Sequence, residues 1–285
     1  MKRRLDGIQL MSVPSALLYG IFFIFPLLQG IRLSFSDWDG MNKISFIGFK
    51  NYIDFFSDSR ALGDIKTTVL FAIGSAFLLN IVGLIYALIM KNKFKYQSLV
   101  RVIIYLPAII SPLIMGYIWY FLLQPGRGFL YRASAFFNYE IAFNWMGQYS
   151  YTIIVLILVN VWQYAGMTMI IYLAGLQSIS KELYESSKID GAKRLQIFRK
   201  ITLPLLIPSI RINVVTNIIG SLSVFDIIMS LTEGGPGYST ESLSIYIMRM
   251  CYGNRTGYST AVAMILFLII LVPVLISFKL TKSRS

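Results

Sequence analysis

The sequence predicts an all-α protein, a polytopic membrane helix bundle with about six transmembrane helices. Composition and the spacing of the apolar residues carry this prediction. Hydrophobic residues make up 56% of the 285 residues and charged residues only 14%, whereas ordinary globular chains are about 25% charged. The mean hydropathy is +0.67. A soluble protein could not bury so much apolar surface, but a lipid bilayer accepts it.

The apolar residues are gathered in six runs, each long enough for a membrane-crossing helix of about 20 residues. The runs are Ile8–Ile31, Thr67–Met90, Val102–Gln124, Tyr151–Ala174, Leu205–Leu231 and Tyr258–Leu280. The first follows a basic start that resembles a signal peptide. It is too long for a signal core and lacks a small-residue cleavage site, so we expect it to be retained. The fifth is the least apolar, because it contains Arg211 and Asp226.

Basic residues lie mainly in alternate loops. The N-terminal segment, the loops after the second and fourth runs, and the C-terminal segment together carry sixteen basic and four acidic residues. The remaining loops carry nine basic and eight acidic residues. Since basic loops stay in the cytoplasm, both termini are predicted to be cytoplasmic. We expect residues 1–65 to hold the first transmembrane helix and an outer loop, and residues 66–280 to hold the other helices.

Several functions are excluded by residue types that the sequence lacks. There is no histidine, which removes histidine-based catalysis and histidine-ligated metals. The single cysteine, Cys251, allows no intramolecular disulfide and no cysteine metal cluster. The net charge of +13 is spread between apolar runs and is not gathered on one domain, so nucleic acid is not an expected partner.

Two other features leave alternatives open. Pro107 and Pro112 in the third run and Pro273 in the sixth are expected to kink their helices, although prolines are common in membrane helices. The outer segments 36–40 and 49–56 are rich in aromatic residues. These residues either anchor the protein at the membrane interface or form a docking surface for an external partner.

The segment 177–208 is too polar for the bilayer but has the pattern of a folded loop. Ser180 is a suitable cap for a helix over Lys181–Ile189, in which Leu183 and Ile189 are apolar positions. Asp190-Gly191 predicts a turn. A second helix over Ala192–Thr202 places its apolar residues at a spacing of three. These residues are Leu195, Phe198 and Ile201. The loop is therefore predicted to be a rigid pair of helices.

This loop resembles the EAA loop in the transmembrane subunits of type I ATP-binding-cassette importers. That motif has Glu-Ala-Ala, a later glycine, and Ile-x-Leu-Pro. The corresponding residues here are Glu185-Ser186-Ser187, Gly191 and Ile201-Thr202-Leu203-Pro204, within the context of Asp190, Ala192 and Phe198. Serines replace the two alanines, but both residue types are small.

Further blocks resemble the carbohydrate-uptake branch of this family, which includes the maltose, glycerol-phosphate and multiple-sugar permeases. The resemblance covers nearly the whole chain. The blocks are Phe46-Ile47-Gly48-Phe49-Lys50-Asn51-Tyr52, Leu106-Pro107 with Trp119, Leu231-Thr232-Glu233-Gly234-Gly235-Pro236, Ser239-Thr240-Glu241 and Gly257-Tyr258-Ser259.

The resemblance implies a permease subunit for a carbohydrate in a prokaryotic cell membrane. Residues 66–280 would be its type 1 transmembrane domain, with the coupling loop at 177–204. The expected partners are a second homologous permease, two cytoplasmic ATPase subunits and an extracytoplasmic sugar-binding protein. The chain has no phosphate-binding loop. It is therefore expected to be no enzyme and to bind no cofactor, with ATP and Mg²⁺ held by the ATPase.

The resemblance also implies roles for particular residues. The residues expected to couple to the ATPase are Glu185, Ser186, Ser187, Asp190, Gly191, Ala192, Phe198, Leu203 and Pro204. The residues expected to line the substrate pathway are Gln163, Tyr164, Met167, Asn217, Gly220 and Ser221. The alternative for these polar groups is helix–helix hydrogen bonding within the bundle.

The expected solute is a neutral mono- or oligosaccharide. No basic residue clearly lies in the middle of the pathway, whereas a phosphorylated solute would need cationic partners. A glycerol phosphate ester is the alternative solute. An ion-coupled secondary transporter is the alternative of a different class, although only Asp226 supplies an intramembrane carboxylate and no internal repeat is visible.

Overall fold

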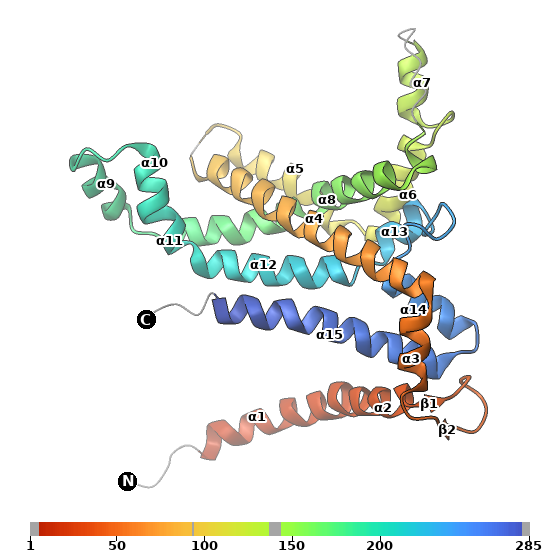
Figure 1. The fold of residues 1–285 in the computed structure, drawn as a ribbon. Helices are drawn as coiled ribbons and strands as arrows, with labels where there is room; N and C mark the ends of the chain where they lie inside the picture. Colours follow the sequence, from red (N-terminus) through yellow and green to blue (C-terminus); the bar gives the residue numbers. More distant parts are fainter. Residues whose placement is uncertain (1–5, 93, 137–143, 281–285) are drawn as a thin grey trace. The chain divides into compact units, whose positions relative to one another are not determined.

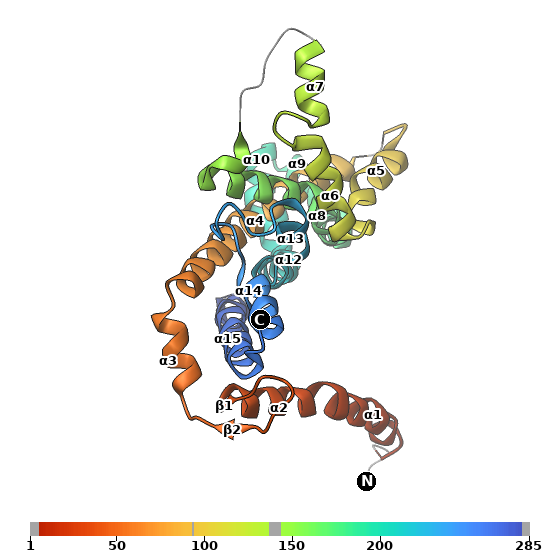
Figure 2. The same ribbon diagram turned by 90° about the vertical axis from the view of Figure 1, so that its right-hand side faces the viewer.

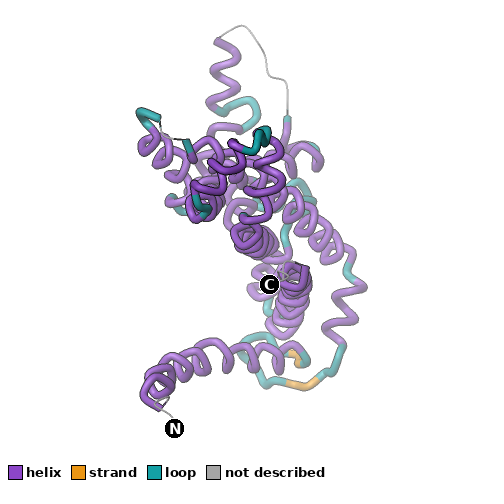
Figure 3. The backbone as a smooth tube through the Cα atoms, turned by 90° about the vertical axis from the view of Figure 1, so that its left-hand side faces the viewer, coloured by secondary structure: helices purple, strands orange, loops and turns teal. Residues whose placement is uncertain are grey.

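The computed structural model describes residues 6–92, 94–136 and 144–280, and nearly all of them are helical (Figure 3). The strands found among these residues are β1 (Ser36–Asp37) and β2 (Ser45–Phe46), which pair antiparallel. Among the described residues, four helices are long and apolar enough to cross a membrane, and the number of candidate spans rises to six if each of two bent helix pairs is one span. The predicted all-α membrane fold is confirmed, while the cytoplasmic location of the termini stays a prediction.

The chain forms two compact units. The first consists of Met1–Leu62 and Tyr246–Leu268, and the second of Gly63–Ile245 and Ile269–Ser285. The predicted functional division at residue 65 stays a prediction, because compactness does not test it.

The first unit begins with a long helical segment that is made of α1 (Asp6–Tyr19), the π-helical η1 (Gly20–Ile24) and α2 (Phe25–Ser34). It includes α3 (Lys50–Ser57) and most of α14 (Leu243–Tyr252), and the first half of α15 (Thr256–Leu280). The backbone N–H of Gly257 donates to the Trp38 carbonyl oxygen at 2.8 Å, which holds the start of α15 beside the outer hairpin.

The second unit is built around α8 (Tyr149–Ser178), drawn in green in Figure 1. Most of α4 (Ser59–Lys91) lies in this unit, and α5 (Gln97–Ile109) and α12 (Ile207–Leu222) pack on α8. The remaining elements are α6 (Pro112–Leu123), α7 (Phe129–Phe136), η2 (Trp145–Gly147), α9 (Lys181–Ile189), α10 (Arg194–Ile197), η3 (Phe198–Thr202), α11 (Leu203–Leu205) and α13 (Asp226–Leu231). Figure 2 shows α6 beside α13, where the two helices are in contact.

Two apolar clusters hold this second unit together. One gathers buried side chains of α4, α8 and α13, with Leu156 and Ile228 fully buried. The other joins α4, α8 and α11–α12 around Met169, Tyr172 and Leu206. Burial of each such side chain contributes about 1.5–3 kcal/mol in water. Within a bilayer, close packing and the internal hydrogen bonds carry more of the stability.

The third and fifth predicted spans are wrong as single helices. The third breaks at Ile110-Ser111, where α5 and α6 meet at 99°. Pro112 begins α6, because a proline at the first turn sacrifices no helical hydrogen bond. The fifth bends by 66° near Leu206 and ends at Leu222, and a separate helix starts at Asp226. The other four predicted spans lie within helical segments.

Candidate functional site

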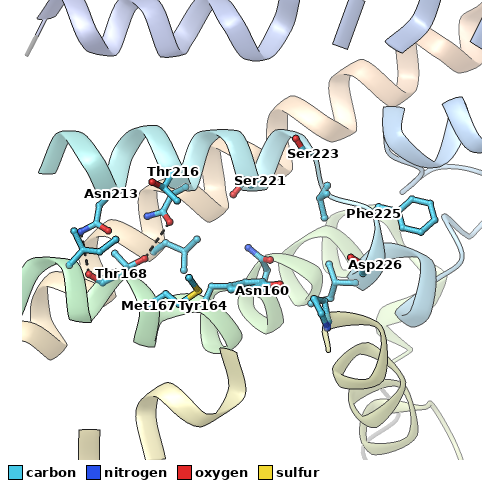
Figure 4. Close-up of a pocket in the computed structure, with 17 residues that line it drawn as sticks. Asn160, Tyr164, Met167, Thr168, Asn213, Thr216, Ser221, Ser223, Phe225 and Asp226 are labelled. Atoms are coloured by element: carbon cyan, nitrogen blue, oxygen red, sulfur yellow. Dashed lines mark hydrogen bonds between the residues drawn. The ribbon is translucent and has the colours of Figure 1, made fainter. Parts of the chain in front are cut away.

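A cavity of about 290 Å³ lies in the second unit between α8 and α12 (Figure 4). Each helix contributes a stripe of side chains with helical spacing. The α8 stripe consists of Asn160, Tyr164, Met167, Thr168 and Ile171. The α12 stripe consists of Asn213, Thr216, Asn217, Gly220 and Ser221. The segment 223–227, where α12 ends and α13 begins, lines the cavity as well.

Five of the six residues predicted for the substrate pathway line this cavity. They are Tyr164, Met167, Asn217, Gly220 and Ser221. Gln163 does not line it. The Gln163 side chain is 0% exposed, and its Nε2 donates to the carbonyl oxygen of Ile110 at 3.3 Å. It therefore bonds a backbone carbonyl at the break between α5 and α6. This agrees with the alternative that these polar groups form hydrogen bonds within the helix bundle.

A chain of three polar residues joins the two stripes. The Thr168 hydroxyl donates to Asn217 Oδ1 at 3.3 Å, and Asn213 Nδ2 donates to the Thr168 carbonyl oxygen at 3.2 Å. Asn213 Oδ1 and Asn217 Nδ2 are buried without a hydrogen-bond partner among the described residues. A buried polar atom left unpaired costs about 1–3 kcal/mol. A rotation of either side chain that brings its unpaired atom to the cavity surface would let it bond a polar guest, Asn213 as an acceptor and Asn217 as a donor.

Sequence reasoning missed several lining residues. They are Asn160, Thr168, Asn213, Thr216, Ser223 and Phe225. A usable signal was present for α8, because Asn160 and Thr168 lie four residues to either side of Tyr164. Segment 223–227 gave no signal, since hydropathy does not reveal that the helix stops at Leu222.

Asp226 is the one charged residue among the described residues that line the cavity. Its side chain is exposed at the start of α13, the helix end that favours a negative charge. No described lysine or arginine lines the cavity. The site therefore combines amides, hydroxyls and an aromatic ring with a single acidic group.

The polar loop of the second unit has the two-helix form expected from the sequence. Helix α9 spans Lys181–Ile189 as predicted, and Ser180 Oγ accepts a hydrogen bond from the Glu182 backbone N–H at 3.2 Å. Gly191 has a φ of +74°, and its N–H donates to the Lys188 carbonyl oxygen at 3.1 Å. A side chain would strain this conformation, so glycine suits the turn.

The second loop helix differs from its prediction. It begins at Arg194 and not at Ala192, and it changes to π-helix over Phe198–Thr202. The wider π-helical turn shifts the phase of the side chains. Leu195, predicted to share one face with Phe198 and Ile201, lies before this turn and is 59% exposed, whereas Ile197 is buried.

Most residues predicted to couple to an ATPase lie at the surface of the loop. Those that are exposed are Glu185, Ser186, Asp190, Gly191, Leu203 and Pro204, while Ala192 and Phe198 are half-buried. Ser187 is buried, and its hydroxyl donates to the Tyr184 carbonyl oxygen at 2.9 Å. Leu183 and Ile189 were counted as apolar positions of α9 and are 44% and 86% exposed. The loop therefore presents apolar side chains beside Glu185.

Known proteins resemble the chain over almost its full length. The probable starch degradation products transport system permease protein of Thermoanaerobacterium thermosulfurigenes is 33% identical over 281 residues, which are 97% of this chain and 94% of the relative. A bacterial ABC transporter involved in the import of the acidic polysaccharide alginate contains a chain with a TM-score of 0.83 and a sequence identity of 26%. The match covers 98% of this chain and 96% of that chain. A chain of the bacterial alginate transporter in complex with an alginate pentasaccharide-bound periplasmic protein has a TM-score of 0.83 and a sequence identity of 25%. The match covers 97% of this chain and 94% of that chain.

Residues 79–283 match a family of transport proteins. This match includes the α8–α12 cavity and the two-helix loop, and it agrees with the full-length similarity to permeases. The chain therefore belongs to the family of binding-protein-dependent transport system inner membrane components.

Proposed function

We propose that this permease forms part of the translocation path for a neutral mono- or oligosaccharide, and that the α8–α12 cavity binds this solute. The observation that carries the proposal is the pair of unpartnered amide atoms, Asn213 Oδ1 and Asn217 Nδ2, buried beside Thr168 and near Tyr164. A sugar has hydroxyl groups that both donate and accept, and apolar ring faces that suit an aromatic side chain. The solutes of the similar transporters, starch degradation products and alginate, support a carbohydrate.

The charge of the cavity supports a neutral solute. An anionic sugar or a glycerol phosphate ester would need cationic groups at its binding site. The described lining residues offer none and include the Asp226 carboxylate. A phosphorylated polyol therefore remains the less favoured alternative. An ion-coupled carrier is disfavoured as well, because it would have no use for the two-helix loop.

The proposed assembly contains a second homologous permease, two cytoplasmic ATPase subunits and an external sugar-binding protein in a prokaryotic cell membrane. ATP and Mg²⁺ belong to the ATPase, and this chain needs no cofactor. In this assembly both termini and the α9–α10 loop lie in the cytoplasm. The exposed side chains Glu185, Leu183 and Ile189 would contact the ATPase, and the Gly191 turn would keep α9 at a fixed angle to the second loop helix.

The test compares uptake of a panel of labelled neutral sugars, uronates and glycerol phosphate in cells that lack the native gene. The cells carry the native chain, the Gly191→Pro, Glu185→Lys double variant, or the matched charge reversal Glu182→Lys outside the motif. We expect one neutral sugar to accumulate with the native chain and with Glu182→Lys, but not with the double variant at equal membrane abundance. Accumulation of glycerol phosphate instead would contradict the neutral-sugar proposal. Equal uptake in the double variant would contradict coupling through the loop.

A further inference from the structure

Tyr184 occupies the junction between the coupling loop and the transmembrane helices. It lies on α9, and its ring faces Lys91, the last residue of α4, with Nζ 3.6 Å from the ring centroid. Its hydroxyl lies 3.2 Å from Thr202 Oγ1 in η3, and Thr202 is only 4% exposed. The ring also packs against the apolar cluster around Tyr172 and Leu206. One side chain therefore joins α9 to both α4 and η3.

Helix α4 continues from this junction to the cavity. It is one helix of 33 residues. Leu79 of the same helix lines the cavity, about 18 Å from Lys91 at 1.5 Å per residue. Asn80 Oδ1 accepts a hydrogen bond from the Tyr172 hydroxyl of α8 at 2.6 Å. A straight helix carries a displacement along its length because its backbone hydrogen bonds resist compression.

Near the cavity, α4 packs closely against α8. A methyl group on Gly83 would lie 2.7 Å from the Thr168 Cβ, so the two helices are in close contact there. Thr168 is also the residue whose hydroxyl bonds the Asn217 amide in the cavity. A shift of α4 would therefore reach the amide that faces the guest.

We propose that Tyr184, held against Lys91 and Thr202, is the positioning residue that transmits movement of the coupling loop through α4 to the cavity. This proposal rests on the proposed function, because it needs an ATPase that moves the loop. Tyr184 contacts neither solute nor nucleotide. Its role is to make α9 and α4 move together. Without Tyr184, ATP hydrolysis should continue but should no longer change the conformation of the cavity.

The test needs no knowledge of the sugar. The purified complex with its partner subunits is placed in lipid nanodiscs, and this chain carries Cys251→Ser and Gly220→Cys. Gly220 lines the cavity, and a Cβ at this position meets nothing within 4 Å. The rate of maleimide labelling at the introduced thiol is measured with and without Mg-ATP and vanadate. ATP hydrolysis by the same sample is measured in parallel.

We expect Mg-ATP and vanadate to change the labelling rate at least fivefold with the native loop. The change should fall below twofold in Tyr184→Leu and in Lys91→Gln, while ATP hydrolysis and the amount of bound ATPase stay within a factor of two. Lys91→Arg and Tyr184→Phe should restore most of the response, because each keeps the cation over a ring. Lys95→Gln, an equal loss of charge four residues after Lys91, is the matched control and should respond like the native chain.

The outcomes separate the two proposals. If Tyr184→Leu and Lys91→Gln both keep the fivefold response, the positioning role is wrong and the proposed function stands. If the ATPase dissociates from the complex in Tyr184→Leu, the positioning role is judged from Lys91→Gln alone, because that variant keeps the Tyr184 ring in place. If the native loop gives no response to Mg-ATP, the coupling role of the loop fails, and the role of Tyr184 fails with it.

Discussion

The phenolic hydroxyl of Tyr246 donates a hydrogen bond to Asp58 Oδ2 at 2.6 Å and lies 3.0 Å from the hydroxyl of Tyr258. Asp58 Oδ1 accepts from the backbone N–H groups of Arg60 at 2.8 Å and Ala61 at 3.4 Å. Burial opposes ionisation of Asp58, but the bonds from Tyr246 and the two amides outweigh it and lower the Asp58 pKa. Burial, followed by the bond to Asp58, raises the Tyr246 pKa. The pair therefore fastens α14 to the start of α4 within the first unit.

Replacement of Tyr246 by phenylalanine should destabilise this first unit. The variant keeps the buried ring but leaves Asp58 without its hydroxyl donor. A hydrogen bond to a charged group contributes about 1.5–3 kcal/mol, and the partial exposure of Asp58 places the expected loss near 1–2 kcal/mol. The measurement is the thermal unfolding midpoint of the purified chain in detergent. Tyr252→Phe, at an exposed position of the same helix, is the control and should unfold like the native chain.

The stability of the first unit should also depend on pH through Asp58. Its pKa is lowered in the folded protein, so its contribution is present above the unfolded value of about 3.9 and is lost as the pH falls through the folded value. Between about pH 5 and pH 3 the native chain should therefore lose more stability than Asp58→Asn. Asp37→Asn, at an exposed position, is the comparison and should keep the native slope. Parallel curves for the native chain and Asp58→Asn would contradict this account.

Close backbone contact between α5 and α8 depends on Gly166. A Cβ at this position would lie 2.8 Å from the Tyr105 Cα, and the obstacle is backbone that cannot rotate away. Gly166→Ala should therefore lower stability by about 1–3 kcal/mol, the usual cost of overpacking. The matched variant is Gly63→Ala in α4, where a Cβ meets nothing within 4 Å. Alanine should stabilise that helix slightly. Detergent unfolding midpoints distinguish the two, and equal midpoints would contradict close packing at Gly166.

The sequence predicted the first helix of the two-helix loop and the long spans well, because local signals define them. Ser180 and Gly191 mark the two ends of α9 by capping chemistry that acts within a few residues. The prolines of the third run predicted a kink there, but not that the helix ends at Ile109 and a new one begins at Pro112, and the break after Leu222 was not predicted at all. Both lie inside apolar runs, and an average over about 20 residues reports how apolar a run is but not where its helix ends. Tertiary contacts, such as the bond from Gln163 to Ile110, stabilise such breaks.

For single residues of the cavity as well, the sequence did not show which side chain faces inward. Gln163 and Tyr164 are neighbours in sequence, so their side chains leave α8 about 100° apart. Only Tyr164 lies on the stripe that lines the cavity. The resemblance to sugar permeases pointed to parts of α8 and α12 that line the cavity. Choosing between adjacent residues needed the rotation of each helix, which depends on packing and which polarity alone does not reveal.

Gln163 should affect stability but not the choice of solute. Gln163→Met keeps a side chain of similar length and removes the bond to the Ile110 carbonyl, but it also removes Oε1, which is buried without a partner among the described residues, so we expect a net loss of at most about 1 kcal/mol. Competition among unlabelled sugars for uptake should follow the native order. The comparison variant is Asn217→Leu, which removes a cavity amide and should weaken uptake of every accepted sugar. A changed order of preference in Gln163→Met would place this residue in the pathway after all.

Filling the cavity should stop transport without unfolding the protein. Gly220 lines the cavity, and a Cβ there meets nothing within 4 Å, so a larger side chain extends into open space. Gly220→Leu should reduce sugar uptake at least tenfold with an unchanged unfolding midpoint, and Gly220→Ala should reduce it less. Labelled uptake and the midpoint are measured on the same membranes. Native uptake in Gly220→Leu would show that the solute passes elsewhere.

Asp226 should set the discrimination against anionic sugars. It is the charged group among the described lining residues, and no described cation there offsets it. Two like charges about 6 Å apart repel by about 3 kcal/mol at an effective dielectric constant near 20. Because the Asp226 side chain is exposed, we expect roughly half of this repulsion energy, which corresponds to about a tenfold difference in binding of the anionic sugar. Asp226→Asn should therefore raise uptake of a labelled uronate about tenfold relative to its neutral parent sugar, most strongly at low salt. An unchanged ratio would mean that the carboxylate does not face the solute, and the external binding protein would then account for the charge preference.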